Sequence, residues 1–147
     1  MKLTSPEFGN NEFIPKKFTC EGEDMNPALI IAGVPVNAKS LALIVDDPDA
    51  PMGMWVHWVV YNIPKGFSRI EENSIPGEQG SNDFGRQNYG GPCPPSGTHR
   101  YFFKIYALDR ELNLKAGLSK KELEKAMQGY MLDKVELVGL YKKTGRY

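Results

Sequence analysis

The sequence predicts a single, mainly β domain over residues 1–147. Short runs of β-branched and aromatic residues recur along the chain, and within several of them apolar residues alternate with others, as in strands. Only one segment, near the C-terminus, has the spacing of an amphipathic helix. Hydrophobic residues make up 41% of the chain, and a domain of this length is able to bury most of its apolar surface without disulfides or metals.

The first clear strand is the apolar run SLALIV, residues 40–45. Turn residues bound it, and its unbroken apolar character is typical of a buried strand. We expect this strand to end at Asp46 and Asp47.

Two further strands are expected at WVHWVVYNI (55–63) and HRYFFKIYAL (99–108), because both runs are rich in aromatic and β-branched residues. Side chains two apart in a strand share a face. One face of the first strand should carry Trp55, His57, Val59 and Tyr61. One face of the second should carry His99, Tyr101, Phe103 and Ile105. Each of the chain's two histidines therefore opens an aromatic strand.

An amphipathic helix is predicted within residues 119–134, where Ser119 and Glu122 form a capping box at its start. Apolar residues recur there at helical spacing, at Leu123, Ala126, Met127, Tyr130 and Met131. This stripe indicates core packing rather than a cofactor site. The segment VELVGLYKK (135–143) then returns to strand character.

Residues 64–97 are rich in Gly, Pro, Asn, Gln and Ser and show little periodicity. The 50 residues that follow hold only two strands and a helix, too little for a second domain. We therefore predict one long surface loop, ordered by its prolines and aromatic residues, and such loops are usually functional.

Charge and composition exclude several classes of partner. The chain has 18 basic and 18 acidic residues, so no overall field attracts nucleic acid or an anionic membrane. The N-terminus lacks the apolar region of a signal peptide, and no run approaches the length of a membrane span. We expect a cytoplasmic protein without integral membrane association.

Cysteine occurs twice, at Cys20 and Cys93. Two cysteines are too few for a disulfide-dense secreted scaffold or an all-cysteine metal site. Two buried thiols and a disulfide are both compatible with the sequence.

Two motifs are able to carry chemistry: DPDAP, which begins at Asp47, and GGPCPPSGTHRY, which ends in His99 and Tyr101. Each joins a rigid turn to a strand that bears a histidine. If these strands share one sheet with their histidine faces aligned, Asp47, His57, His99 and Tyr101 meet in one pocket.

Such a pocket suits an anion. An imidazole titrates near pH 6.5, and a neighbouring carboxylate such as Asp47 raises its pKa. A protonated histidine, a tyrosine hydroxyl and backbone N–H groups near the glycines are the donors that phosphate or another oxyanion needs. Trp55 and Trp58 would supply apolar walls if they face the cavity.

With these residues assembled, the chain resembles the phosphatidylethanolamine-binding protein family, also called the Raf kinase inhibitor protein family, in its compact bacterial and archaeal branch. The matching segments are FTCEGEDMNPAL, SLALIVDDPDAP, WVHWVVYNIP, NDFGRQNYGGPCPPSGTHRYFFKIYALD and AMQGYMLDKVELVGLYKK. The resemblance implies a β-sandwich of two antiparallel sheets with a few short helices.

The family's anion pocket, carried onto this chain, implies the following set of ligand-binding residues: Asp47, Asp49, Trp55, His57, Gly91, Pro92, His99 and Tyr101. No catalytic residue, metal or cofactor belongs to this set. The resemblance also places Cys20 and Cys93 near the site, as a disulfide or as neighbouring thiols, and makes Ala50–Pro51 a candidate cis peptide. Mammalian members carry a C-terminal helix beside the pocket that the sequence to Tyr147 lacks, which implies a more open mouth and a homodimer.

The leading functional hypothesis is a small binding protein for phosphate-bearing or other anionic ligands, phospholipid headgroups included. The alternative implied by the family is inhibition of a serine protease or modulation of a kinase by protein contact, with the loop 64–97 as the contacting surface. An enzyme is the third class, because Asp47, His57 and His99 have the composition of a two-histidine, one-carboxylate iron site. No recognisable nucleophile arrangement supports catalysis.

Overall fold

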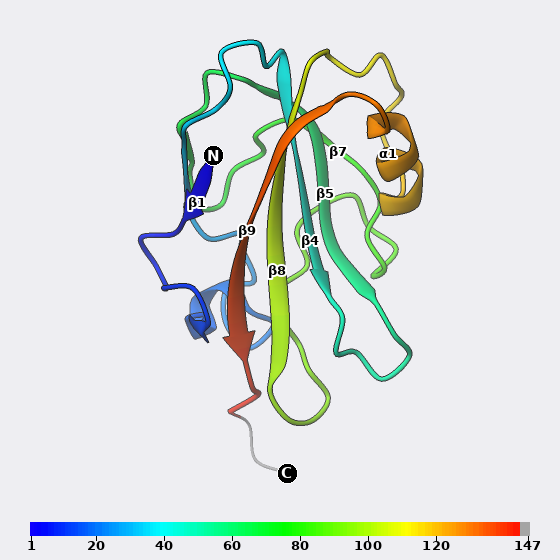
Figure 1. Ribbon diagram of the computed structural model, residues 1–147. Helices are drawn as coiled ribbons and strands as arrows, with labels where there is room; N and C mark the ends of the chain where they lie inside the picture. Colours follow the sequence, from blue (N-terminus) through cyan, green and yellow to red (C-terminus); the bar gives the residue numbers. More distant parts are fainter. Residues whose placement is uncertain (145–147) are drawn as a thin grey trace.

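Strands make up most of the regular structure in the computed structural model, which describes residues 1–144 (Figure 1). The strands are β1 (Lys2–Thr4), β2 (Glu12–Phe13), β3 (Leu29–Ala32), β4 (Ser40–Asp47), β5 (Trp55–Pro64), β6 (Arg69–Ile70), β7 (Glu78–Gln79), β8 (His99–Leu108) and β9 (Met131–Tyr141). The helical segments are the short 3-10 helix η1 (Lys16–Phe18) and the α-helix α1 (Lys120–Met127). The predicted mainly β fold is confirmed, and the expected strands all form.

The strands form two sheets that pack face to face. The large sheet has the order β2-β9-β8-β4-β5-β7 and the small sheet the order β1-β3-β6. All pairings are antiparallel except that of β2 with β9, which is parallel. Apolar side chains from both sheets, such as Leu29 of β3 and Leu43 of β4, form the core between them. This is the sandwich that the family resemblance implied.

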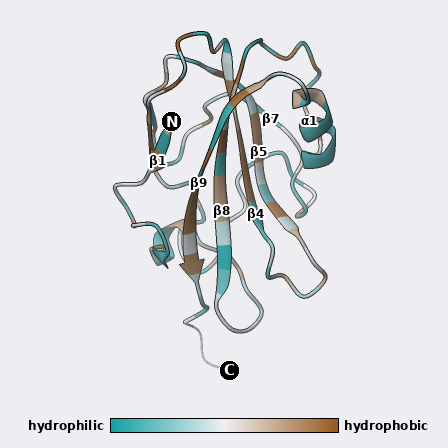
Figure 2. Cartoon of the chain, in the orientation of Figure 1, coloured by the Kyte–Doolittle hydropathy of each residue, from teal (hydrophilic) through white to brown (hydrophobic). Residues whose placement is uncertain are grey.

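A second apolar cluster covers the opposite face of the large sheet. Ala42 and Ile44 of β4 pack there with Leu123 and Met127 of α1. Strand β4 is therefore buried on both faces, which explains the unbroken apolar run in its sequence. Figure 2 shows hydrophobic residues concentrated on the long central strands, whereas most of α1 is hydrophilic.

Helix α1 begins as predicted, with Ser119 and Glu122 forming both hydrogen bonds of the capping box. It ends earlier than predicted, at Met127, so Tyr130 and Met131 do not belong to its apolar face. The cause is Gly129, whose φ of +83° ends the helix and turns the chain into β9. No helix among residues 1–144 has both the length and the apolar character needed to cross a membrane.

A β-bulge at His57 changes the faces of β5. Val45 pairs with Trp58 while Asp46 pairs with Val56, so His57 is an extra residue opposite the β4 ladder. After the bulge, Val59 and Tyr61 face the helix side, whereas Trp55 and His57 line a pocket on the other side. The expectation that all four share one face is wrong, because alternation restarts at the bulge.

Candidate functional site

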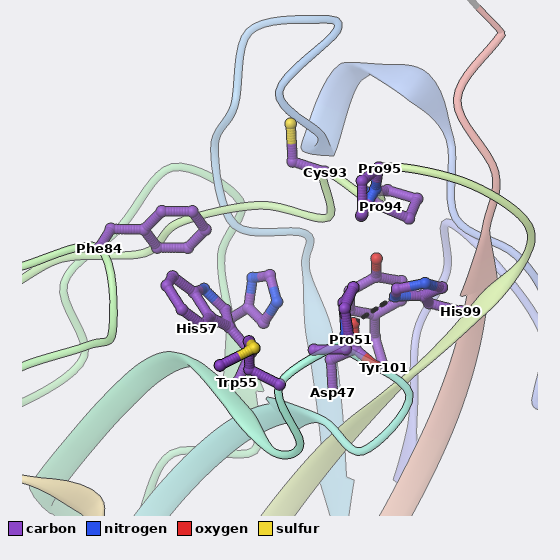
Figure 3. A pocket seen from close by; sticks show the side chains of 12 residues that line it. Asp47, Pro51, Trp55, His57, Phe84, Cys93, Pro94, Pro95, His99 and Tyr101 are labelled. Atoms are coloured by element: carbon purple, nitrogen blue, oxygen red, sulfur yellow. Dashed lines mark hydrogen bonds and ion pairs between the residues drawn. The ribbon is translucent and has the colours of Figure 1, made fainter.

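A pocket of about 300 Å³ lies at the end of the large sheet where β4 ends and β5 and β8 begin, the lower end in Figure 1. Its polar lining consists of Asp47, His57, His99 and Tyr101, the four residues that the sequence predicted to meet (Figure 3). Its remaining walls are Ala50, Pro51, Met52, Trp55, Phe84, Cys93, Pro94 and Pro95. The site therefore combines a few buried polar groups with apolar walls, as small-molecule sites usually do.

Asp47 and His99 form a buried pair on one side of the pocket. The Nδ1 of His99 lies 2.7 Å from Oδ2 of Asp47, and both side chains are less than a tenth exposed. The other carboxylate oxygen accepts the backbone N–H of Asp49 at 2.7 Å, an Asx turn of the kind that Asp-Pro sequences favour. Asp47 thus closes the turn after β4 and orients the imidazole of His99.

His57 is held on its Nδ1 side by backbone. The Nδ1 lies 2.7 Å from the Gly90 carbonyl oxygen, and because a carbonyl oxygen only accepts, Nδ1 carries the proton. The Gly90 N–H in turn donates to the His57 carbonyl at 3.0 Å. Burial lowers the pKa of His57 despite the raising effects of the Gly90 carbonyl and Asp47. The pKa of this histidine is thus shifted opposite to the upward shift that a neighbouring carboxylate predicts, because desolvation is the larger effect.

Tyr101 lies between the two histidines. Its ring centroid is 5.2 Å from that of His57 and 6.5 Å from that of His99. Burial raises the pKa of the Tyr101 phenol far above its ordinary value, so the hydroxyl remains protonated. It can donate a hydrogen bond into the pocket at any physiological pH.

Three of the predicted ligand-binding residues lie outside the pocket lining. The N–H of Gly91 donates to Asp24 Oδ1 at 2.7 Å, and the carbonyl of Pro92 accepts from the Cys20 N–H at 3.1 Å. A Cβ at Gly91 would collide with Asp24 and with the backbone of Phe18 and Thr19 at the end of η1, so the glycine serves a close backbone approach rather than a ligand. Asp49 binds both the side chain and the backbone N–H of Arg100.

Cys20 and Cys93 form a disulfide, with their Cα atoms 5.5 Å apart. Cys20 is exposed and Cys93 half-buried, so the alternative of two buried thiols is wrong. The bridge joins the pocket wall at Cys93 to the segment after η1. The hydroxyl of Tyr89 reinforces this contact by donating to the Phe18 carbonyl at 2.7 Å.

The Ala50–Pro51 peptide bond is trans, which contradicts the expected cis bond. The turn bends by other means. Asp47 caps its first part, and the Gly53 N–H donates to the Ala50 carbonyl at 3.0 Å. Gly53 has a φ of +101°, a conformation that glycine adopts without strain and that completes the reversal.

Sequence reasoning missed Phe84 and misplaced Trp58. Phe84, from the long loop, packs edge-on against Trp55 and His57 at centroid distances of 5.5 and 5.3 Å. Trp58 instead lies in the core beyond the bulge, where its Nε1–H donates to Gln79 at 2.8 Å. The only feature of the sequence that could have indicated Phe84 is an aromatic residue within a loop rich in glycine.

The pKa of His57 predicts an acid-sensitive contribution to stability. In the unfolded chain its pKa returns to about 6.5, above the folded value. The unfolded chain then binds a proton that the folded protein does not, so the free energy of unfolding falls as the pH drops below about 6.5. Above that pH the contribution is constant. Urea unfolding from pH 8 to 5 measures this slope, which should be shallower in His57→Asn; an equal slope in both proteins contradicts the assignment.

Among residues 1–144, no three His, Cys, Asp or Glu side chains are placed so that they could hold a metal ion. Asp47, His57 and His99 are therefore not arranged as the two-histidine, one-carboxylate set that their composition suggested. Nδ1 of His57 faces a backbone carbonyl instead.

Comparisons with known proteins agree with the fold and cover nearly the whole chain. A family model described as phosphatidylethanolamine-binding protein matches residues 4–142. A UPF0098 protein of Pyrococcus horikoshii is 56% identical over 149 residues, which cover 95% of this chain and 75% of the relative. A UPF0098 protein of Methanothermobacter thermautotrophicus is 48% identical and is covered over 99% of its length, for 97% of this chain.

Two crystal structures are similar as well. A phosphatidylethanolamine-binding protein homolog from Chlamydia trachomatis is 43% identical and superposes with a TM-score of 0.94, covering 97% of each chain. YbcL of E. coli, described as a member of the mammalian family, is 32% identical with a TM-score of 0.89, over 97% of this chain and 98% of its own.

Proposed function

The chain belongs to the phosphatidylethanolamine-binding protein family, and on this premise we propose that its pocket binds a small anionic group, such as phosphate or a phosphorylated headgroup. The observation that carries the proposal is the buried Asp47–His99 pair in an apolar-walled pocket. When His99 is protonated, Nδ1–H stays on Asp47 and Nε2–H is free to donate to an anion. The hydroxyl of Tyr101 is a second donor.

The walls favour a ligand that has an apolar part next to its anionic group. Pro51, Trp55 and Phe84 line the cavity together with the polar residues. Met52 lies at the rim with its side chain almost fully exposed. Contact with these side chains would contribute affinity that a small anion alone lacks, because burying apolar ligand surface against them is favourable.

Tyr101→Phe should weaken the binding of phosphoethanolamine by about tenfold, because it removes one hydrogen bond to a charged ligand and little else. Chemical-shift changes in proton–nitrogen NMR spectra measure the dissociation constant. Tyr106→Phe is the matched control, since Tyr106 is buried on the helix side of the sheet, and it should leave binding unchanged. Shifts that are absent, or that centre away from the pocket, would refute the anion site.

The same proposal holds that the protein binds its ligand without catalysing a reaction and without a cofactor or metal, that it forms a homodimer, and that it works in the cytoplasm. Disulfides are rare in most cytoplasms but frequent in those of hyperthermophilic archaea and bacteria. Inhibition of a serine protease or a kinase is the alternative. It gains weight only if phosphoethanolamine and phosphate cause no shifts at millimolar concentration.

A further inference from the structure

The pocket offers hydrogen-bond donors on one side and an acceptor on the other. The Tyr101 hydroxyl supplies one donor, and His99 supplies a second in its protonated form. His57 differs from them because its Nδ1–H is committed to the Gly90 carbonyl, so that its second nitrogen, Nε2, carries a lone pair. Figure 3 shows the imidazole of His57 between Trp55 and the Asp47–His99 pair.

Backbone pairing fixes the orientation of His57. The Gly90 N–H donates to the His57 carbonyl, and the His57 Nδ1–H donates to the Gly90 carbonyl. The side-chain amide of Asn82 also donates to the His57 carbonyl, at 3.4 Å. The rings of Phe84 and Tyr101 pack edge-on against the imidazole. The imidazole therefore cannot rotate to offer its N–H to a ligand without losing these contacts.

Burial keeps the Nε2 of His57 an acceptor, against the effect of the charged and polar groups around the ring. Asp47 at the end of β4 and Asp46 behind it act on the imidazole, as do the carbonyls of Gly90 and Gly91 from the long loop, but burial outweighs their combined raising of its pKa. From β8, His99 is paired with Asp47 and Tyr101 stays protonated. Arg100 points its charge at Asp49 outside the pocket lining.

An anion without a hydrogen atom to donate would place an oxygen lone pair against that of Nε2. We propose, building on the anion site above, that His57 selects ligands by protonation state. The preferred ligand is the monoanion of a phosphate monoester, whose P–OH donates to His57 while its charged oxygens accept from His99 and Tyr101. Phosphodiesters, sulfate esters and fully deprotonated monoesters lack this hydrogen and are bound more weakly.

Methyl phosphate and methyl sulfate test this directly. At pH 5.5 methyl phosphate is mostly a monoanion, since the second pKa of a phosphate monoester is about 6. Methyl sulfate then has nearly the same shape and charge but carries no hydrogen on its oxygens. We expect NMR titration of the wild-type protein to give about tenfold tighter binding of methyl phosphate. At pH 8, where methyl phosphate has lost this hydrogen, the ratio of the two affinities should fall towards one.

The variant His57→Asn, whose amide can donate, should bring the ratio at pH 5.5 to about one. A second readout needs no variant: the Nε2 resonance of His57 in nitrogen-detected imidazole spectra should be that of an unprotonated nitrogen and should shift on adding methyl phosphate. Equal binding of the two esters by the wild type overturns the inference and leaves the anion site intact. Binding of neither ester overturns the anion site itself. Short-chain phosphatidic acid, compared with methyl phosphate, shows whether the monoester is a lipid headgroup or a free small molecule.

Discussion

Replacing both Cys20 and Cys93 with serine is expected to lower the free energy of unfolding by about 3 to 4 kcal/mol. The bridge joins residues 73 positions apart, so in the unfolded chain it closes a long loop and removes much of its conformational entropy. Denaturant unfolding of the oxidised wild type and of the double variant measures the difference.

Reductant provides the control for this prediction. Wild-type protein unfolded in the presence of a thiol reductant should match the double variant, whereas the variant itself should not respond to reductant. Equal stability of the oxidised and reduced wild type would show that the bridge does not constrain the unfolded chain.

Ligand binding should change far less than stability when the bridge is removed. Three hydrogen bonds also hold the pocket wall that contains Cys93. The Tyr89 hydroxyl donates to the Phe18 carbonyl, the Cys20 N–H to the Pro92 carbonyl and the Gly91 N–H to the Asp24 carboxylate. These contacts remain in the folded serine variant. Reduction therefore acts mainly on the unfolded state.

Asp46→Asn is the second substitution with a large expected effect, a loss of about 3 kcal/mol in the free energy of unfolding. Asp46 is fully buried, and its Oδ2 lies 3.0 Å from Nζ of Lys104 and 2.8 Å from Nζ of Lys120. Both lysines are mostly buried, so removing the carboxylate leaves two poorly solvated charges without a counter-ion. Lys120 belongs to the first turn of α1, so the loss should also loosen the helix.

Asp49→Asn is the matched control for this substitution, made three residues further along the chain. Its ion pair with Arg100 is solvent-exposed, and surface pairs contribute about 1 kcal/mol or less. Thermal or urea unfolding of the two variants under the same buffer compares them. A loss in Asp46→Asn no larger than in Asp49→Asn would show that the buried triad adds nothing to stability.

The two neighbouring aspartates at the end of β4 serve opposite faces of the sheet. Asp46 points to the helix side and binds two lysines, whereas Asp47 points to the pocket and binds His99. Side chains of successive strand residues alternate between faces, so one short acidic pair stabilises the packing of α1 and orders the pocket.

The sequence by itself determined the features that depend on neighbouring residues. Strand β8 begins and ends where its aromatic run predicted, and the capping box places the start of α1 at Ser119. His99 and Tyr101 share the pocket face because alternation within an unbroken strand is local geometry. The meeting of Asp47, His57, His99 and Tyr101 followed from placing their three strands in one sheet.

Tertiary structure decided the rest, because those features depend on partners far apart in the chain. The bulge at His57 is a matter of register against β4, and it turned Trp58 into the core. The sequence left the Gly91 N–H free to bind a ligand, but in the structure it donates to Asp24, 67 positions away. The sequence was compatible with either a disulfide or two thiols, and the fold decides for the disulfide because it places Cys20 beside Cys93. The pKa of His57 depends in the same way on burial, a property of all the chain segments that surround the imidazole and of no single motif.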